Sequence, residues 1–513
     1  MGSQSNKSTS LLKNTAIVLV FSIAAKLLSL VRESAVAAFA GAGMEADAYY
    51  MVQGIYAVFE LGLSTAIFQS FFPLYKQLSL EDEGKERSRR FANAAITLLL
   101  IIAAGLALIE ICGRQIIVDL LAPGFSEEAK MLVGSLIWFS APMLLFVIAA
   151  ECISTVLRSH DRFARSQMRE LGTHIASIIV VVLLYRKWGA AALGLSMLLG
   201  AVLRLVIQLP GFGKVYRYRP SFAFRDKDVV EMFRRIPATL VTAAATQLKG
   251  IVDRLMASLL PVGSVSALNY GHRIETALGG LLSTAIATGL YPEMVTLHTK
   301  GEKRKLRELL DRSVGIFALV AIPLCVGCFL FGSEIVTLIY QRGAFGAKES
   351  QVTARVFSAY ILGTFFSGAS AITANVFYAA GDTKTPMKIN CIDLVLNVAL
   401  NLLFCSLFGV VGLAAATSLS GVIAYLLRVR AVCRHVGEPE QHGGRETAKI
   451  VCAALIAGAV SVGVTALVPI GGALIRLALA VAVMIAVDLL VLVLMKSKNL
   501  TVTLAFVRNK LGR

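Results

Sequence analysis

Residues 188–210 read WGAAALGLSMLLGAVLRLVIQLP, an apolar run in which Arg204 is the one charged residue. About 20 apolar residues in a helix suffice to cross the roughly 30 Å hydrocarbon core of a bilayer. The run is continuous, whereas the strands of a membrane barrel alternate apolar and polar residues over about ten positions. This stretch therefore predicts a transmembrane helix.

Runs of this kind recur along the whole chain of 513 residues. The chain is 57% hydrophobic and 16% charged, with a mean hydropathy of +0.73, and soluble globular chains are only about 45–50% apolar. We therefore predict an all-α polytopic membrane protein with fourteen transmembrane helices. The expected spans are 12–40, 47–75, 91–112, 131–157, 171–185, 188–210, 232–260, 265–298, 312–335, 351–380, 386–408, 410–433, 447–469 and 472–495.

The net charge is +18, and the distribution of the basic residues along the chain shows what this charge means. In a soluble chain it would raise nucleic acid as a partner. Here most Lys and Arg residues fall in the N-terminal tail and in every second loop after it. By the positive-inside rule this predicts cytoplasmic N and C termini and no nucleic-acid partner. The eight cysteines are scattered through or beside apolar runs, so we expect neither a disulfide nor a metal site.

The chain contains an internal repeat. WGAAAL at 188–193 resembles FGVVGL at 408–413, and Tyr49 and Pro73 match Tyr270 and Pro292, always about 220 residues apart. Each copy has six predicted helices, an even number, so both copies enter the membrane from the same side, as in transporters with parallel repeats. The predicted domains are an N-terminal six-helix bundle (1–213), a cytoplasmic amphipathic linker (214–231), a C-terminal six-helix bundle (232–435), and helices 13 and 14 with a cytoplasmic tail (436–513).

Several basic residues lie inside predicted helices. A cation near the bilayer centre costs at least about 2.5–3.5 kcal/mol, so it normally faces a cavity or a partner. We expect Arg32 and Arg273 to face a shared cavity, because their neighbours Glu33 and His272 point elsewhere on an ideal helix. Arg204 is expected to snorkel from its helix end. The six residues are Lys26, Arg32, Arg204, Lys249, Arg254 and Arg273.

A cationic cavity suits an anion, and Arg binds phosphate oxygens through paired donors, so we expect a phosphorylated substrate. Lys249 and Asp253 have the i, i+4 spacing of an ion pair, which leaves a structural role open for Lys249.

Asn390, Asp393, Asn397 and Asn401 share one helix face. One interpretation is that they only hold helices together. Alternatively, Asp393 and Asn397, approached by Asp253, bind a coupling cation such as Na⁺, or Asp393 carries a proton. There is no P-loop, GxSxG or HExxH motif, so we predict neither an enzyme nor a cofactor beyond this Na⁺ or H⁺ coupling, and assign no metal site firmly.

Arg32-Glu33 and the segment FAGAGMEADAY at 39–49 resemble the MurJ (MviN) lipid II flippase family, part of the multidrug/oligosaccharidyl-lipid/polysaccharide exporter superfamily. Further similarity lies in GSVSALNY at 263–270 with Arg273, YQRGAF at 340–345 and GDTKTP at 381–386. The resemblance implies a flippase of the bacterial cytoplasmic (inner) membrane, and we expect the protein to act as a monomer. Such a flippase moves the undecaprenyl-pyrophosphate-linked peptidoglycan precursor, lipid II, from the cytoplasmic to the outer leaflet by alternating access. Its expected partners are this lipid and the surrounding membrane lipids.

The resemblance also assigns residues. In this family, cavity arginines contact the pyrophosphate, and the last two helices form a groove for the lipid tail. Lys26 stands where many members have Arg, and residues 50–73 lack an arginine that many members carry. Two alternatives therefore stay open: a flippase for another undecaprenyl-linked polysaccharide intermediate, or a cation-coupled multidrug exporter. The predicted substrate-binding residues are Lys26, Arg32, Glu33, Asp47, Lys249, Arg254 and Arg273, and the predicted coupling-ion residues are Asp253, Asp393 and Asn397.

Overall fold

The computed structural model describes residues 2–81, 86–438, 443–468, 472–501 and 503, and in these residues the chain forms helices and no strand. The long apolar runs explain this, because a backbone in hydrocarbon must satisfy its hydrogen bonds within each segment. The helices are α1 (Gly2–Ala40), α2 (Met44–Glu81), α3 (Glu86–Cys112), α4 (Arg114–Leu121), α5 (Glu127–Ser159), α6 (Phe163–Trp188), α7 (Ala190–Val206), α8 (Leu209–Phe212), α9 (Lys227–Ser258), α10 (Ser264–Thr299), α11 (Lys303–Leu330), α12 (Gly332–Tyr340), α13 (Ala347–Ala379), α14 (Lys384–Val436), α15 (Gly443–Leu467) and α16 (Ala473–Leu494).

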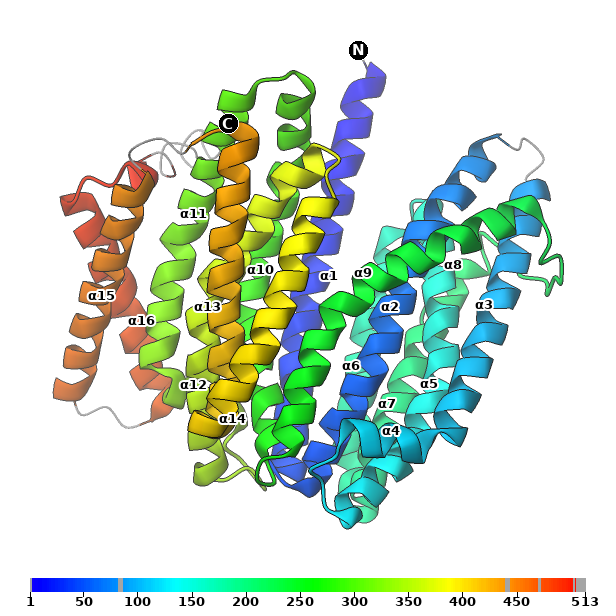
Figure 1. Cartoon of the computed structure of the whole chain (residues 1–513), viewed down its shortest axis with the longest axis horizontal. Helices are drawn as coiled ribbons and strands as arrows, with labels where there is room; N and C mark the ends of the chain where they lie inside the picture. Colours follow the sequence, from blue (N-terminus) through cyan, green and yellow to red (C-terminus); the bar gives the residue numbers. More distant parts are fainter. Residues whose placement is uncertain (1, 82–85, 439–442, 469–471, 502, 504–513) are drawn as a thin grey trace. The chain divides into compact units, whose positions relative to one another are not determined.

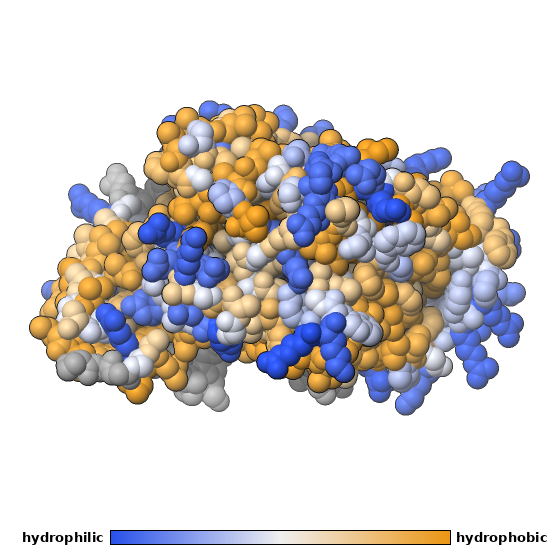
Figure 2. Space-filling model, turned by 90° about the horizontal axis from the view of Figure 1, so that it is seen from below, coloured by the Kyte–Doolittle hydropathy of each residue, from blue (hydrophilic) through white to orange (hydrophobic). Residues whose placement is uncertain are grey.

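The helices are those of a multi-pass membrane protein. Ten of them, among the described residues, are long and apolar enough to cross a membrane. Large apolar side chains face outward, such as Val395 and Leu183, which are 68% and 66% exposed. The face seen in Figure 2 is correspondingly mostly apolar, with hydrophilic side chains gathered in patches. The all-helical membrane fold is confirmed, and the number of fourteen spans stays a prediction.

Two tight turns at glycine separate helices that follow one another closely. α6 and α7 meet at Gly189, with φ 52° and ψ −132°. α14 is 53 residues long and consists of two helices joined across a kink at Gly409, with φ 59° and ψ −137°. Such a backbone conformation is essentially restricted to glycine. The kink lies where the sequence separates 386–408 from 410–433.

The chain divides into two compact units. Unit 1 comprises Met1–Ser266 and Arg342–Phe345, and unit 2 comprises Ala267–Gln341 and Gly346–Arg513. Within unit 1, α9 packs against α2 (Figure 1). The core of unit 1 includes Phe71 and Phe91, and that of unit 2 includes Phe317 and Phe377. The domain boundaries predicted from the sequence follow the internal repeat and not these units, and they stay a prediction.

The segment before α9 is extended and lies along α3. Tyr216 is buried and Arg217 exposed, Tyr218 is half-buried and Arg219 exposed, so the segment is amphipathic with the two-residue period of a strand. The Tyr216 hydroxyl donates to Asn93 Oδ1 at 2.9 Å, and burial raises the pKa of this tyrosine. At the start of α9, the Arg87 guanidinium donates to both carboxylate oxygens of Asp228, at 2.8 and 2.9 Å. These contacts fix the segment before α9 to α3 within unit 1.

We predict that Gly409→Ala destabilises the protein by about 1–3 kcal/mol, the typical cost of forcing a side chain into a backbone conformation reserved for glycine. An added Cβ would meet no described atom within 4 Å, so backbone strain is the cause. Gly421→Ala is the matched control, because Gly421 lies in the same helix with equal space and an ordinary φ, where alanine is favoured by about 0.5–1 kcal/mol. The measurement is thermal unfolding in detergent, and equal midpoints for the two variants would contradict the prediction.

Candidate functional site

Arg32 forms a buried ion pair on α1. Arg32 is 8% exposed and Glu33 is fully buried, and Arg32 Nη2 contacts Glu33 Oε1. The Tyr50 hydroxyl of α2 donates to Glu33 Oε2 at 2.5 Å. The expectation that Glu33 points away from Arg32 is wrong, because both side chains are long enough to bend toward each other across adjacent positions. Glu33 thus lies between Arg32 and Tyr50 and holds the guanidinium in place.

The ion pair leaves Arg32 with donors to spare. Glu33 is the one acid within ion-pair distance of Arg32 in the described part of the chain. A guanidinium carries five N–H donors in a planar fork and stays protonated. Arg32 is therefore a fixed cation that can donate to a further anion without giving up Glu33. Lys26 stands seven residues before Glu33, two helical turns away, so these two residues share a face of α1.

α9 contributes three predicted residues to unit 1. Asp253 is 6% exposed, and Lys249 lies one turn before it. Arg254 Nη1 donates to the Gly250 carbonyl at 3.1 Å. Its side chain covers Gly54 of α2, where an added Cβ would lie 2.6 Å from Arg254 Cδ. The glycine therefore makes the space in which the arginine passes between α2 and α9.

Asp47 binds the start of another helix. Its Oδ2 accepts from the Gly263 amide at 2.6 Å, and its Oδ1 accepts from the amide and the hydroxyl of Ser266, both at 2.7 Å. The first turn of a helix has amides without intrahelical acceptors, and a carboxylate also favours the positive end of the helix dipole. Asp47 therefore caps α10 with both oxygens. This geometry gives it a positioning role.

Glycines bring the loop after α1 into close backbone contact with residues 342–345. The Ala344 amide donates to the Ala38 carbonyl at 2.8 Å. Gly41 has φ +64°, and a Cβ there would lie 2.7 Å from the Ala344 carbonyl oxygen. Gly343 has φ +57° and lies against the Ala38 backbone. Gly41 of FAGAG and Gly343 of RGAF are thus required for close approach.

A second buried charge network lies elsewhere in unit 1, and the sequence did not predict it. Arg204 is 6% exposed and meets three acids, Glu60 of α2, Glu151 of α5 at 3.9 Å and Glu170 of α6 at 3.3 Å. Arg169 pairs with Glu151 and Glu170. The expectation that Arg204 snorkels is therefore wrong. The sequence did contain a signal for this network: Glu60, Glu151 and Glu170 lie in or beside apolar runs, and an acid inside the membrane requires a partner.

Unit 2 contains Arg273, half-buried on α10. Two residues further along, Glu275 accepts from Thr364 Oγ1 of α13 at 2.8 Å, and its Oε2 lies 3.5 Å from His272 Nδ1. Arg273 and Arg32 belong to different compact units. The cavity that these two arginines were expected to share stays a prediction.

The polar stripe of α14 is largely engaged in contacts within α14, mostly between its helical segments before and after Gly409. Asn397 Nδ2 donates to Thr417 Oγ1 at 3.0 Å, and Asn401 Nδ2 donates to Asn397 Oδ1 at 3.3 Å. Asn390 Oδ1 accepts from Arg428 at 2.7 Å. These bonds favour the interpretation of the stripe as helix glue. In the described residues no three His, Cys, Asp or Glu side chains gather as a metal site, and Na⁺ or H⁺ coupling through Asp393 stays a prediction.

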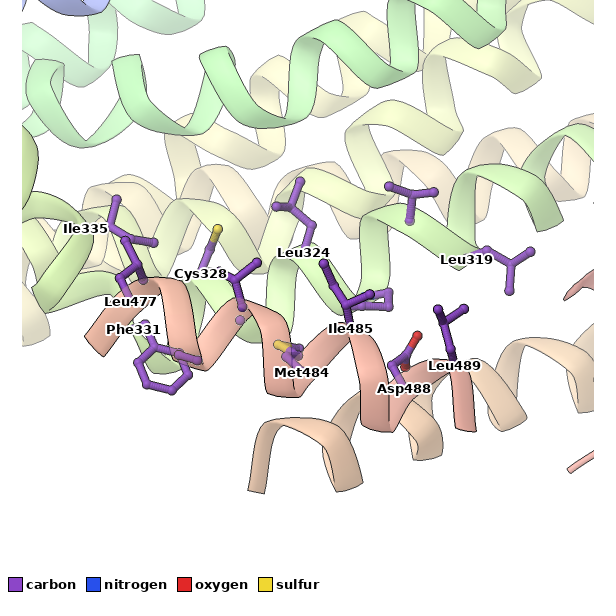
Figure 3. A pocket seen from close by; sticks show the side chains of 15 residues that line it. Leu319, Leu324, Cys328, Phe331, Ile335, Leu477, Met484, Ile485, Asp488 and Leu489 are labelled. Atoms are coloured by element: carbon purple, nitrogen blue, oxygen red, sulfur yellow. The ribbon is translucent and has the colours of Figure 1, made fainter. Parts of the chain in front are cut away.

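An apolar groove of about 310 Å³ lies in unit 2 between α16 and the helices α11 and α12. Leu324, Phe331, Leu477 and Met484 are among the residues that line it, and Asp488 is its one acidic residue (Figure 3). Of the last two helices, only α16 contributes lining residues in the described part of the chain, whereas the resemblance implies a tail groove formed by both. Occupation by a lipid tail stays a prediction.

Known proteins resemble the chain over most of its length. A family model described as lipid II flippase MurJ matches residues 36–482. A probable lipid II flippase MurJ of Vibrio cholerae is 26% identical over 88% of each chain, and a lipid II flippase MurJ of Burkholderia cenocepacia is 27% identical over 79% of this chain and 81% of its own.

Solved structures share the fold. A lipid II flippase MurJ in an inward closed conformation aligns with a TM-score of 0.80 and 22% identity, over 93% of this chain and 99% of its own. An inward-facing multidrug transporter of the MATE family aligns with a TM-score of 0.67 and 12% identity, over 80% and 94%. These two likenesses show the fold.

We predict that Asp47→Asn lowers the thermal unfolding midpoint. The amide retains one oxygen where the carboxylate offers two, and its NH₂ group would face an N–H donor, which should cost about 1–3 kcal/mol. Asp119→Asn is the matched control, because the Asp119 side chain is 52% exposed and pairs with Lys130 at 3.4 Å, a surface contact of small energy. Equal midpoints for Asp47→Asn and the wild type would refute the capping role.

Proposed function

The chain belongs to the lipid II flippase MurJ family, and we propose from this premise that it moves lipid II from the inner to the outer leaflet of the bacterial cytoplasmic membrane. The family match extends through both compact units, and the curated relatives carry the same name. The multidrug transporter of the MATE family shares the fold at 12% identity, so it lends no support to drug export. A different undecaprenyl-linked glycan has no comparable support.

Arg32 is the single observation that carries the proposal within the site. It is buried and positively charged, and it meets one acid, whereas Arg204 meets three. The three carboxylates around Arg204 would repel a further anion. Arg32 has one carboxylate beside it and a fixed orientation, so its remaining N–H donors are suited to bind phosphate oxygens. Arg32 contacts the pyrophosphate in our proposal. Glu33 and Tyr50 position it, and Lys26, Lys249, Arg254 and Arg273 add positive charge.

Alternating access requires parts of the protein to move, and the contacts of Asp47 are suited to be broken and remade. Within unit 1, Asp47 holds the Gly263 and Ser266 amides, and Ala38 holds the loop at Ala344. Hydrogen bonds and backbone contacts exchange for water at moderate net cost, about 0.5–1.5 kcal/mol each. In our proposal these contacts open and close in each transport cycle.

The turn geometry supports two parallel six-helix repeats followed by two helices, fourteen spans in all. Gly189 and Gly409 share nearly the same φ and ψ about 220 residues apart. Asp161 and Gly381, again about 220 residues apart, both have positive φ. In both copies the residue after the positive-φ position, Arg162 or Asp382, donates its amide in a 2.9 Å hydrogen bond to the carbonyl five residues earlier. Local geometry thus recurs with the spacing of the sequence repeat.

The proposal involves no covalent change in the cargo, so it assigns no catalytic residue and no cofactor. The protein acts as a monomer among membrane lipids, with both termini in the cytoplasm. The driving force is an Na⁺ or H⁺ gradient coupled through Asp393, with Asp253 and Asn397 as further oxygen ligands. Oxygen ligands are those that hard cations prefer.

We predict that the wild-type chain rescues a strain depleted of its essential lipid II flippase, and that Arg32→Ala and Arg273→Ala do not. Arg32→Lys should rescue only partly, because it keeps the charge and loses the bidentate fork. Arg186→Ala is the control, since Arg186 is exposed in the last turn of α6. Membrane abundance is measured in parallel. Full rescue by both alanine variants would refute the arginine model, and failure of an abundant wild-type protein would refute lipid II as the cargo.

We predict that Asp393→Asn changes the dependence of transport on Na⁺ or on pH. Removing the charge removes a cation ligand and a proton site together. Asp382→Asn is the control, because Asp382 is a half-buried residue of the turn before α14, and hydrogen bonds from Thr385 and Lys384 hold its pKa below the usual range. The measurement is lipid II translocation at varied Na⁺ and pH. Identical profiles for Asp393→Asn and the wild type would remove Asp393 from the coupling site.

A further inference from the structure

Asp488 is a buried carboxyl group in an otherwise apolar groove. It is 5% exposed, and Figure 3 shows its side chain directed from α16 toward the groove. No group in the described part of the chain donates a hydrogen bond to its Oδ1. The ion pairs and caps described above give no role to this residue. A buried polar atom without a partner is uncommon and requires an explanation.

The lining residues do not neutralise the carboxylate. The groove is lined by fifteen residues of α11, α12 and α16, and they include no Lys, Arg or His. An ionised carboxylate in an apolar site without a partner is strongly unfavourable. Either a proton or a ligand must therefore supply the missing positive charge. If a proton neutralises Asp488, the groove has no preference for a cation. If a ligand neutralises Asp488, the groove binds a cation.

The shape of the groove suits one narrow chain with its head at one end. Its volume of about 310 Å³ lies at the lower end of ordinary ligand pockets. The lining residues of α16 run from Leu477 to Leu489, a length of about 18 Å at 1.5 Å per residue. Asp488 lies near one end of this stretch, and apolar side chains such as Leu477 and Phe331 line the other end (Figure 3). A ligand with a polar head and an apolar chain matches this arrangement.

We propose that the groove binds a single-chain amphiphile with a protonated amine, whose ammonium group pairs with Asp488 while its chain extends toward Leu477 and Phe331. An ammonium group donates up to three hydrogen bonds and accepts none, so it complements an acceptor without a partner. The pair is protected from water by the apolar lining, which strengthens it. The inference stands apart from lipid II transport, because it concerns a cationic ligand.

The test measures binding of radiolabelled dodecylamine and dodecanol to the purified full-length protein in nanodiscs of neutral lipid, without lipid II. We expect the wild type to bind the amine at least about tenfold more tightly than the alcohol, equivalent to about 1.4 kcal/mol. Asp488→Asn should lose this preference, since it keeps the size and loses the charge. Asp488→Leu is a second variant that suits the apolar groove and should also lose it. Met484→Leu preserves the apolar lining and should retain it.

Two outcomes would overturn the proposal. Equal binding of amine and alcohol by the wild type would mean that Asp488 is protonated and selects no cation. Unchanged amine binding by both Asp488→Asn and Asp488→Leu would place the amine elsewhere on the protein. Thermal unfolding of each variant shows that the fold is intact. Complementation by the same variants is scored separately, so a failed binding test leaves the proposed flippase function untouched.

Discussion

The structure depends on one constraint: a charge inside hydrocarbon must have a partner. The cost of an unpaired ion at the bilayer centre, at least about 2.5–3.5 kcal/mol, is large compared with the energy of most single contacts. In unit 1 the constraint is met by Glu33 for Arg32, and by a network of three acids for Arg204. The network joins α2, α5, α6 and α7, so the same ion pairs that neutralise charge also decide which helices pack together.

The fold was largely predictable from the sequence, because the signals that decide it are local. The length of an apolar run determines a span, and a glycine at the end of a run allows the tight turn seen at Gly189 and Gly409. The partners of buried charges were less predictable. Arg204 and Glu60 are separated by 144 positions, and no local pattern indicates that they meet. Arg32 and Glu33 are adjacent, but ideal helix geometry neglects how far two long side chains can bend.

The structure explains a glycine in each of two motifs that carry the sequence similarity. The segments FAGAG and RGAF supported a family resemblance before any role for their glycines was evident. The structure supplies the reason, because Gly41 and Gly343 bring the backbones near Ala38 and Ala344 close enough for a direct hydrogen bond. Asp47 illustrates the same point. The sequence placed it among substrate-binding residues, and the structure shows its two oxygens capping α10.

The number of acids around a buried arginine distinguishes a residue that stabilises the protein from one suited to bind cargo. Arg204 is surrounded by acids, so a further anion would have to compete with carboxylates that are already in place. Arg32 is held by Glu33, which is itself held by Tyr50, and its remaining donors keep their direction when a ligand arrives. Because its orientation is fixed beforehand, a phosphate group would not have to order the side chain, and less binding energy would be lost to side-chain entropy. Lys26 can add charge but not the same geometry, since an ammonium group lacks the planar fork. A cation with one partner, rather than none or three, therefore satisfies both the membrane and the substrate.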